Sequence, residues 1–217
     1  MVMSATLLHM TEKPCLTYIN RKPLRRPMIK EPYFFGYGSL VNTATHDFPD
    51  PQPASLRGWR RAWRHTDLRP VAFLTAIPDP GAEIDGMIAH VPGDDWQALD
   101  EREWAYDRVT ATQAVSHRLK HPAEIAVYAV PAARHSFPTA RHPVLLSYVD
   151  VVLQGYLRVF GEAGIDRFID TTDGWDTPIL DDRAEPRYPR HQPLTRDETA
   201  LVDARLAAIG VRIVQEV

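Results

Sequence analysis

The stretch Tyr33-Phe34-Phe35-Gly36-Tyr37-Gly38-Ser39-Leu40 decides how the rest of this 217-residue chain is interpreted. It begins with an aromatic run that is typical of a buried strand and ends in a Gly-Ser turn. Glycine tolerates the close approach of a ligand, and consecutive free backbone N–H groups form an anion-binding concavity. A Gly-Ser turn after a strand is most often only a turn, so residues 37–40 become a candidate binding loop only in combination with other features.

The order of the expected elements indicates an α+β fold. Turn signals bound segments rich in β-branched and aromatic residues, which predict strands at 33–38, 56–65, 71–77, 84–91, 106–116 and 124–130. Helices are expected at 94–103, from Pro143 to about Phe160, at 165–171 and at 195–208, the last with a capping box of Thr195 and Glu198. Strands that come mostly first and helices that come mostly late argue against an alternating βαβ order.

The predicted helix 94–103 singles out one carboxylate. At 100° per residue, Trp96, Leu99 and Glu103 lie within about 40° of one face, whereas Glu101 points away from it. A carboxylate on an apolar face is costly unless it is paired or protonated, and burial raises its pKa toward the range where a general acid–base works best. The alternative is a structural glutamate tied to Arg102, Arg108 or a backbone amide.

Two motifs together resemble the γ-glutamylcyclotransferase family, including its ChaC-type and AIG2-like branches. They are the loop Tyr37-Gly38-Ser39-Leu40 and the downstream run Leu99-Asp100-Glu101-Arg102-Glu103, which is followed by Tyr106. The resemblance extends from about Tyr33 to Phe168. Within it, Ser147-Tyr148 and Gln154-Gly155 look like the family's Ser-x-x-Tyr…Gly helix, although here the serine and the tyrosine are adjacent.

The resemblance implies a small closed mixed β-barrel flanked by helices, and an enzyme that cyclises a γ-glutamyl group to 5-oxoproline and releases an amine. Glu103 would be the acid–base residue, and Tyr37, Gly38, Ser39, Leu40 and Tyr148 would bind the substrate, the two tyrosines through their hydroxyls. The reaction would need no metal, nucleotide or redox cofactor. The substrate remains open among glutathione, γ-glutamyl amino acids, γ-glutamyl amines and a γ-glutamyl-capped metabolite. The rival functions are a non-catalytic small-ligand-binding barrel and an amidohydrolase that uses water.

Composition limits the other classes. The chain is 44% hydrophobic and 24% charged, has no apolar run long enough for a membrane span, and has Cys15 as its single cysteine, which predicts a cytoplasmic protein with no membrane partner. Residues 1–30 form a predicted basic arm with six basic residues and one acidic residue, but without interleaved aromatics it does not indicate a nucleic-acid partner. The oligomeric state is not predicted.

We expect a γ-glutamylcyclotransferase-like domain at 31–172, and an extended coil followed by a helix at 173–217 that packs on the same domain. Within this last part, the charged segment 181–190 has two interpretations: a lid whose arginines meet a second substrate carboxylate, or a solvated, salt-bridged coil.

Overall fold

The fold is built on one strongly curled mixed sheet. A computed structural model describes residues 30–67, 70–139 and 141–215. The sheet has the strand order β4-β6-β1-β3-β2-β5, with β8 also paired to β2. Its strands are β1 (Glu31–Gly36), β2 (Gln52–Arg64), β3 (Phe73–His90), β4 (Asp107–Thr110), β5 (Val115–Ser116), β6 (Ala123–Ala129) and β8 (Thr172–Asp173). A second, small parallel sheet joins β7 (Val144–Leu145), β9 (Ile179–Leu180) and β10 (Ile213–Val214).

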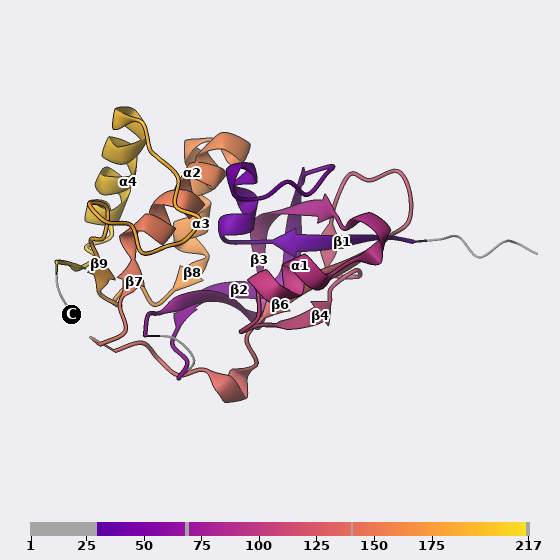
Figure 1. The fold of residues 1–217 in the computed structure, drawn as a ribbon, viewed down its shortest axis with the longest axis horizontal. Coiled ribbons are helices and arrows are strands. Elements are labelled where there is room, and N and C mark those ends of the chain that lie inside the picture. Colours follow the sequence, from indigo (N-terminus) through magenta and orange to yellow (C-terminus); the bar gives the residue numbers. More distant parts are fainter. Residues whose placement is uncertain (1–29, 68–69, 140, 216–217) are drawn as a thin grey trace, which may run out of the picture.

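The predicted fold class, α+β with a curled mixed barrel-type sheet and flanking helices, is confirmed. Strands β1 and β6 run parallel, β2 and β8 also run parallel, and the remaining pairs are antiparallel. Figure 1 shows the sheet curling as a half-barrel, with α2 (Leu146–Phe160), α3 (Glu162–Asp170) and α4 (Arg196–Ala208) gathered at one end of it. The short α1 (Gln97–Arg102) lies on the sheet's other side.

The predicted strands 71–77 and 84–91 are one strand. β3 continues through Pro78 and Pro80 and pairs with β2 at 73–78 and again at 83–88. The pairing register shifts between Arg57 and Trp59, where Gly58 has a φ of 79°. Prolines are tolerated in a sheet where a bulge interrupts the ladder, so the turn signals at 78–80 mark a bulge in a long hairpin rather than the end of a strand. The predicted strand 106–116 is instead divided into β4 and β5.

The aromatic run of β1 separates two cores. Successive side chains of a strand point to opposite faces, so Phe35 joins the main core while Phe34 packs with Leu99 of α1 in a smaller cluster. Leu40 belongs to the same smaller cluster. The site loop therefore follows β1 at the point where both cores meet.

Helix α2 is buried along most of its length and packs on the segment that follows the site loop. Asn42 donates to the Val151 carbonyl at 3.0 Å and to Gln154 Oε1 at 2.9 Å. A Cβ at Gly155 would lie 2.8 Å from the Asn42 backbone nitrogen, so the close approach of helix and loop requires glycine there. This contact fixes the loop relative to Tyr148, two turns earlier on the helix.

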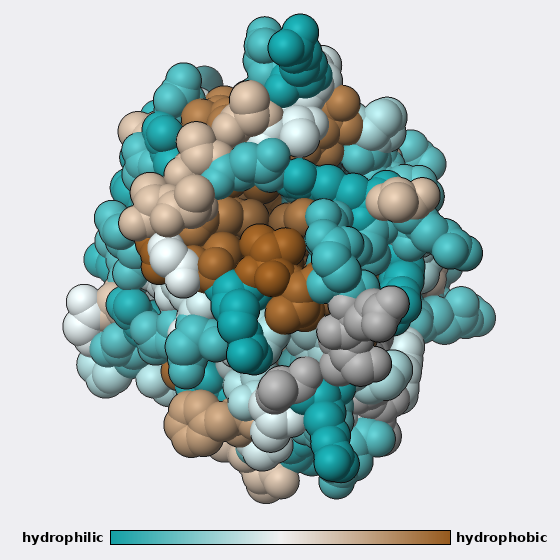
Figure 2. Space-filling view, turned by 90° about the vertical axis from the view of Figure 1, so that its left-hand side faces the viewer, coloured by the Kyte–Doolittle hydropathy of each residue, from teal (hydrophilic) through white to brown (hydrophobic). Residues whose placement is uncertain are grey.

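The C-terminal part contains β9, α4 and β10. The capping box of α4 is confirmed, since Thr195 Oγ1 accepts from the Glu198 N–H and Glu198 accepts from the Thr195 N–H. Figure 2 views the molecule from the end where α4 lies in Figure 1. This face has a hollow with an apolar floor and a mostly hydrophilic rim. In the described part of the chain, no helix is long and apolar enough to cross a membrane. Apart from Lys30, the predicted basic arm lies outside the described residues, as does Cys15.

Candidate functional site

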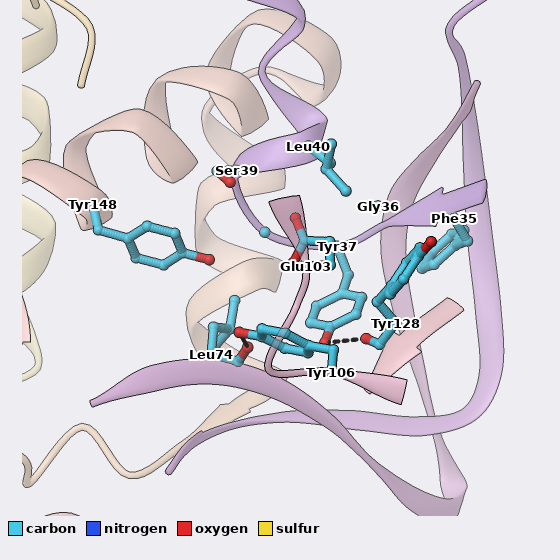
Figure 3. Close-up of a pocket in the computed structure, with 11 residues that line it drawn as sticks. Phe35, Gly36, Tyr37, Ser39, Leu40, Leu74, Glu103, Tyr106, Tyr128 and Tyr148 are labelled. Carbon is cyan, nitrogen blue, oxygen red and sulfur yellow. Dashed lines mark hydrogen bonds between the residues drawn. The ribbon is translucent and has the colours of Figure 1, made fainter. Parts of the chain in front are cut away.

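All six residues predicted for the site line one pocket. Tyr37, Gly38, Ser39 and Leu40 come from the loop after β1, Glu103 from the end of α1, and Tyr148 from the first turn of α2 (Figure 3). The sequence did not single out the other members of the lining as site residues; they are Phe35, Gly36, Leu74, Tyr106 and Tyr128. Of these, Phe35 and Gly36 belong to the strand that leads into the loop, and Tyr106 follows the Leu99–Glu103 motif; Leu74 and Tyr128 had no sequence signal.

After β1, the loop forms one short 3-10 turn, and its N–H groups do not take part in the sheet. This turn, η1 (Ser39–Val41), closes with Val41 N–H donating to Gly38 O at 3.0 Å and Asn42 N–H donating to Ser39 O at 3.1 Å. Among the described residues, the backbone bonds of loops and turns use none of the N–H groups of Gly38, Ser39 and Leu40. The Ser39 N–H is a backbone donor to the Tyr148 hydroxyl, so the N–H groups of Gly38 and Leu40 are the ones left open to a ligand, which is the feature that an anion-binding loop requires.

Gly38 is required for space rather than for a positive φ. Its φ is −123°, which other residues also adopt. A Cβ built on Gly38 would lie 2.6 Å from Tyr148 Oη and 3.3 Å from Leu74 Cδ2. The glycine therefore lets the Tyr148 hydroxyl approach the loop.

For the cyclisation that the resemblance implies, we expect Gly38→Ala to lower kcat/KM at least about tenfold. The added methyl would have to push the Tyr148 hydroxyl out of its place, and small misplacements of groups that position a substrate are costly. Steady-state rates of 5-oxoproline formation measure the change. Gly81→Ala is the control, since a Cβ there would have only an ordinary contact with Asp79 at 3.5 Å. Equal activity of both variants would remove the close approach at Gly38 from the mechanism.

The Tyr37 hydroxyl corrects one expectation. It donates to the Tyr128 carbonyl at 2.7 Å and accepts from the Ala76 N–H at 3.0 Å. Burial raises its pKa well above the ordinary value, although the Ala76 N–H opposes this, so the hydroxyl stays protonated and bound between β6 and β3. Its single proton is spent inside the protein, so the hydroxyl is not free to donate to a ligand as expected. Tyr37 contributes its ring and backbone to the pocket.

A buried arginine fixes the peptide between Tyr37 and Gly38. Arg61 of β2 is fully buried and donates from Nε to the Tyr37 carbonyl at 3.0 Å, while Tyr156 Oη donates to the same carbonyl at 3.0 Å. Arg61 also donates to Thr171 Oγ1 at 2.6 Å and to the Asp85 carbonyl. The C=O and N–H of a trans peptide point in opposite directions, so holding this carbonyl toward Arg61 turns the Gly38 N–H away from Arg61.

No ion pair joins Arg61 to any described residue. Its guanidinium lies over the rings of Tyr156, at 5.1 Å, and Phe168, at 4.7 Å. Burial lowers the pKa of the guanidinium, and the neighbouring Tyr156 opposes that shift. The alternation of side chains along a strand puts Arg61 on the same face as Trp63, but nothing in that pattern indicates that Arg61 supports the loop.

Glu103 is the residue after α1 rather than part of its last turn. The helix begins at Gln97 and ends at Arg102, and the Glu103 N–H closes it by donating to Leu99 O at 2.9 Å. The Glu103 side chain is 16% exposed and lines the pocket. Glu101 is exposed and accepts from Gln97 Nε2 at 2.9 Å, so the predicted difference between the two glutamates is found.

Arg102 connects Glu103 to the loop region. Its Nε lies 3.2 Å from Glu103 Oε1, which is one of the ion pairs that the structural alternative anticipated. The same guanidinium donates to Ser39 Oγ at 3.2 Å and to the Thr45 carbonyl at 2.9 Å. The pair is nearly enclosed and fixes the carboxylate relative to Ser39.

Tyr148 completes the pocket from the helix side (Figure 3). Burial, helped by the neighbouring Tyr188 and by the charge of Glu103, raises its pKa well above the ordinary value, so the hydroxyl is a hydrogen-bond donor throughout the neutral range. Its ring packs edge-on against Trp63 and against Tyr188. Tyr188, which the sequence did not indicate, also donates to Ser39 Oγ at 2.8 Å.

The pocket has an inner and an outer part. The inner part has a volume of about 30 Å³, and an adjoining chamber has about 500 Å³. Four residues line both: Ser39, Glu103, Tyr106 and Tyr148. They mark the junction, which is wide enough on its outer side for a small organic ligand.

The chain is a curled α+β half-barrel whose pocket combines a Gly-Ser loop with a nearly enclosed glutamate, and sequence comparison gives its family. The sequence model described as "Gamma-glutamyl cyclotransferase, AIG2-like" matches residues 34–145, just over half of the chain. The chain therefore belongs to this family. No curated protein matches the sequence significantly.

Solved structures show the same fold at low identity. A protein described as "Gamma-glutamyl cyclotransferase" is 13% identical, with a TM-score of 0.52 over 81% of this chain and 99% of that one. An uncharacterized protein from Homo sapiens is also 13% identical, with a TM-score of 0.51 over 79% of this chain and 97% of that one. YkqA from Bacillus subtilis is 18% identical, with a TM-score of 0.50 over 64% of this chain and 53% of its own.

Proposed function

We propose that this protein is a γ-glutamylcyclotransferase, which converts a γ-glutamyl amide into 5-oxoproline and a free amine. The observation that supports this most directly is that one pocket gathers the loop 37–40, Glu103 and Tyr148 from three separate parts of the chain. Family membership makes this chemistry the natural candidate, and the pocket holds the residue types that the chemistry needs.

In the proposed reaction, the α-amine of the γ-glutamyl group attacks the carbonyl carbon at the end of its own side chain. A C–N bond forms, and the C–N bond of the original amide breaks. Glu103 takes a proton from the α-ammonium and delivers it to the departing nitrogen; a second proton follows the same route, so the amine leaves as an ammonium ion. Nucleophile and electrophile belong to one molecule, so the protein chiefly holds a reactive conformer.

The loop amides of Gly38 and Leu40 are proposed to bind either the substrate's α-carboxylate or the oxygen that becomes negative during attack. Both roles need N–H groups that are oriented before the substrate arrives. Arg61 and Tyr156 supply this orientation for the Gly38 N–H by holding the Tyr37 carbonyl on the opposite side of the same peptide. The Tyr148 hydroxyl, protonated and close to Gly38, is a further donor to the same region.

The reacting atoms are proposed to lie at the junction of the two parts of the pocket. The inner volume of about 30 Å³ is close to that of one water molecule, so it holds only the end of a ligand. Glu103 borders both parts, which puts its carboxylate beside a substrate that extends into the outer chamber. The amine half of the substrate would then lie against the outer wall.

The deciding experiment is mass-spectrometric identification of the product from a panel of γ-glutamyl compounds, including glutathione, γ-glutamyl amino acids and γ-glutamyl amines. We expect 5-oxoproline together with the free amine. Free glutamate would instead identify a hydrolase that uses water. Saturable binding without any product would identify a non-catalytic ligand-binding protein.

A further inference from the structure

The outer chamber has a cationic wall that the proposed chemistry does not use. Two arginines, Arg187 and Arg190, form this wall. They come from the segment between β9 and α4, outside the family-matched residues 34–145. They line only the outer chamber, whereas Tyr37, Gly38 and Leu40 line only the inner part. The loop amides and the two arginines therefore serve opposite ends of a bound molecule.

The two arginines are available for an anion, unlike other arginines near the site. Neither Arg187 nor Arg190 forms an ion pair with any carboxylate of the described residues. By contrast, Arg102 is engaged with Glu103, and Arg183 makes charge-assisted bonds to Asp150 and Asp203 at 2.7 Å. Among the described residues that line the chamber, the carboxylates are Glu103, which has Arg102 beside it, and Glu101.

The segment that carries these arginines is held in place from two sides. Asp182, which is buried, accepts from the Ser147 N–H at 2.8 Å, from Ser147 Oγ at 2.6 Å and from the Arg187 N–H at 2.9 Å. At the other side, Tyr188 donates to Ser39 Oγ of the site loop. Residues 187–190 thus form a built wall of the chamber rather than a freely solvated coil.

We propose that Arg187 and Arg190 bind a carboxylate on the amine half of the substrate, so that the preferred substrates are γ-glutamyl amino acids or peptides rather than γ-glutamyl amines without an acid group. This inference rests on the proposed function. Guanidinium groups bind carboxylates through paired, charge-assisted hydrogen bonds, which are stronger than neutral ones. The rest of the chamber, with Phe73, Trp104 and Tyr106, offers apolar surface to the amine's side chain.

The test compares γ-glutamylphenylalanine with its C-terminal amide, which has the same shape but no negative charge. In the wild-type protein we expect kcat/KM to be at least about tenfold higher for the acid, the effect of one charge-assisted hydrogen bond. In Arg187→Gln/Arg190→Gln this preference should fall to within about twofold, while kcat/KM for the amide and the melting temperature stay unchanged. Arg118→Gln, which removes an exposed arginine that lines none of the described parts of the pocket, should keep the preference.

Two results would overturn the assignment of these arginines. Equal turnover of acid and amide by the wild-type protein would show that no charge is recognised on the amine half. An equal loss of both substrates in the double variant would show that the arginines bind the glutamyl end instead.

Absence of 5-oxoproline from both compounds would refute the proposed function rather than the carboxylate site. In that case calorimetric binding of the two compounds to Glu103→Gln, with and without the double substitution, measures the same preference without turnover. Tighter binding of the acid that the double substitution abolishes would support the carboxylate site at Arg187 and Arg190. Equal binding of the acid and the amide would refute it.

Discussion

Glu103→Gln is expected to lower the rate of 5-oxoproline formation by about 10²–10⁴-fold, the usual contribution of a general acid–base residue. The amide has the same shape as the carboxylate and fits the position beside Arg102, but it cannot carry a proton from the α-ammonium to the leaving nitrogen. Because the side chain is partly exposed and at the end of a short helix, the fold should be retained. Product formation, circular dichroism and substrate binding by calorimetry measure the three quantities separately.

Glu101→Gln is the matched control. It changes the same side chain two residues away, but Glu101 is exposed and bonded to Gln97, so activity should remain within about twofold of wild type. Near-normal turnover by Glu103→Gln, or an equal loss in both variants, would refute the role of Glu103 as proton carrier.

Arg61→Met is expected to destabilise the fold by about 2–4 kcal/mol and to reduce the activity of the folded fraction. The carbonyls of Tyr37 and Asp85 would have to share the single proton of Tyr156, and a buried acceptor left without a donor costs about 1–3 kcal/mol. The Thr171 hydroxyl would lose the bond from Arg61 but keep its own bond to the Arg167 carbonyl at 2.6 Å. Urea unfolding and steady-state kinetics measure the two effects.

Arg60→Met is the control for this variant. Arg60 is the neighbouring arginine on β2, points to the other face of the strand, and pairs with Asp173 where both side chains are partly exposed. An exposed pair of this kind contributes about 0–1 kcal/mol. If Arg61→Met unfolds no more easily than Arg60→Met and keeps full activity, the loop does not depend on the buried guanidinium.

The sequence predicted those parts of the fold that depend on local chemistry. The aromatic run of β1, the capping box at Thr195 and the helix after Pro143 are each set by neighbours along the chain, and the structure contains them. The sequence wrongly predicted two separate strands in place of β3, because Pro78 and Pro80 are local turn signals. Only the pairing with β2 across a bulge makes an extended backbone favourable there.

The candidate site divides in the same way. Motifs and helical periodicity predicted Tyr37, Glu103 and Tyr148 as site residues, and the structure brings them together in one pocket. Their catalytic and binding roles remain a prediction. The sequence could not predict the roles of Arg61 and Tyr188. These roles come from contacts with the Tyr37 carbonyl and with Ser39, which are far away in the sequence. The Tyr37 hydroxyl was misassigned for the same reason, since its partners come from β6 and β3.

The link from Asp182 through Ser147 and Tyr188 to Ser39 has a consequence for biosynthesis. During translation the ribosome synthesises the loop at Tyr37 and the carboxylate at Glu103 long before Tyr188. A nascent chain that contains most of the sheet therefore still lacks one wall of the chamber beside Glu103. A chain that stops after α3 would retain the proposed proton carrier yet lack the wall that encloses the amine half. Such a product would contain β1 to β7 of the full-length protein and still lack the residues proposed to discriminate among ligands.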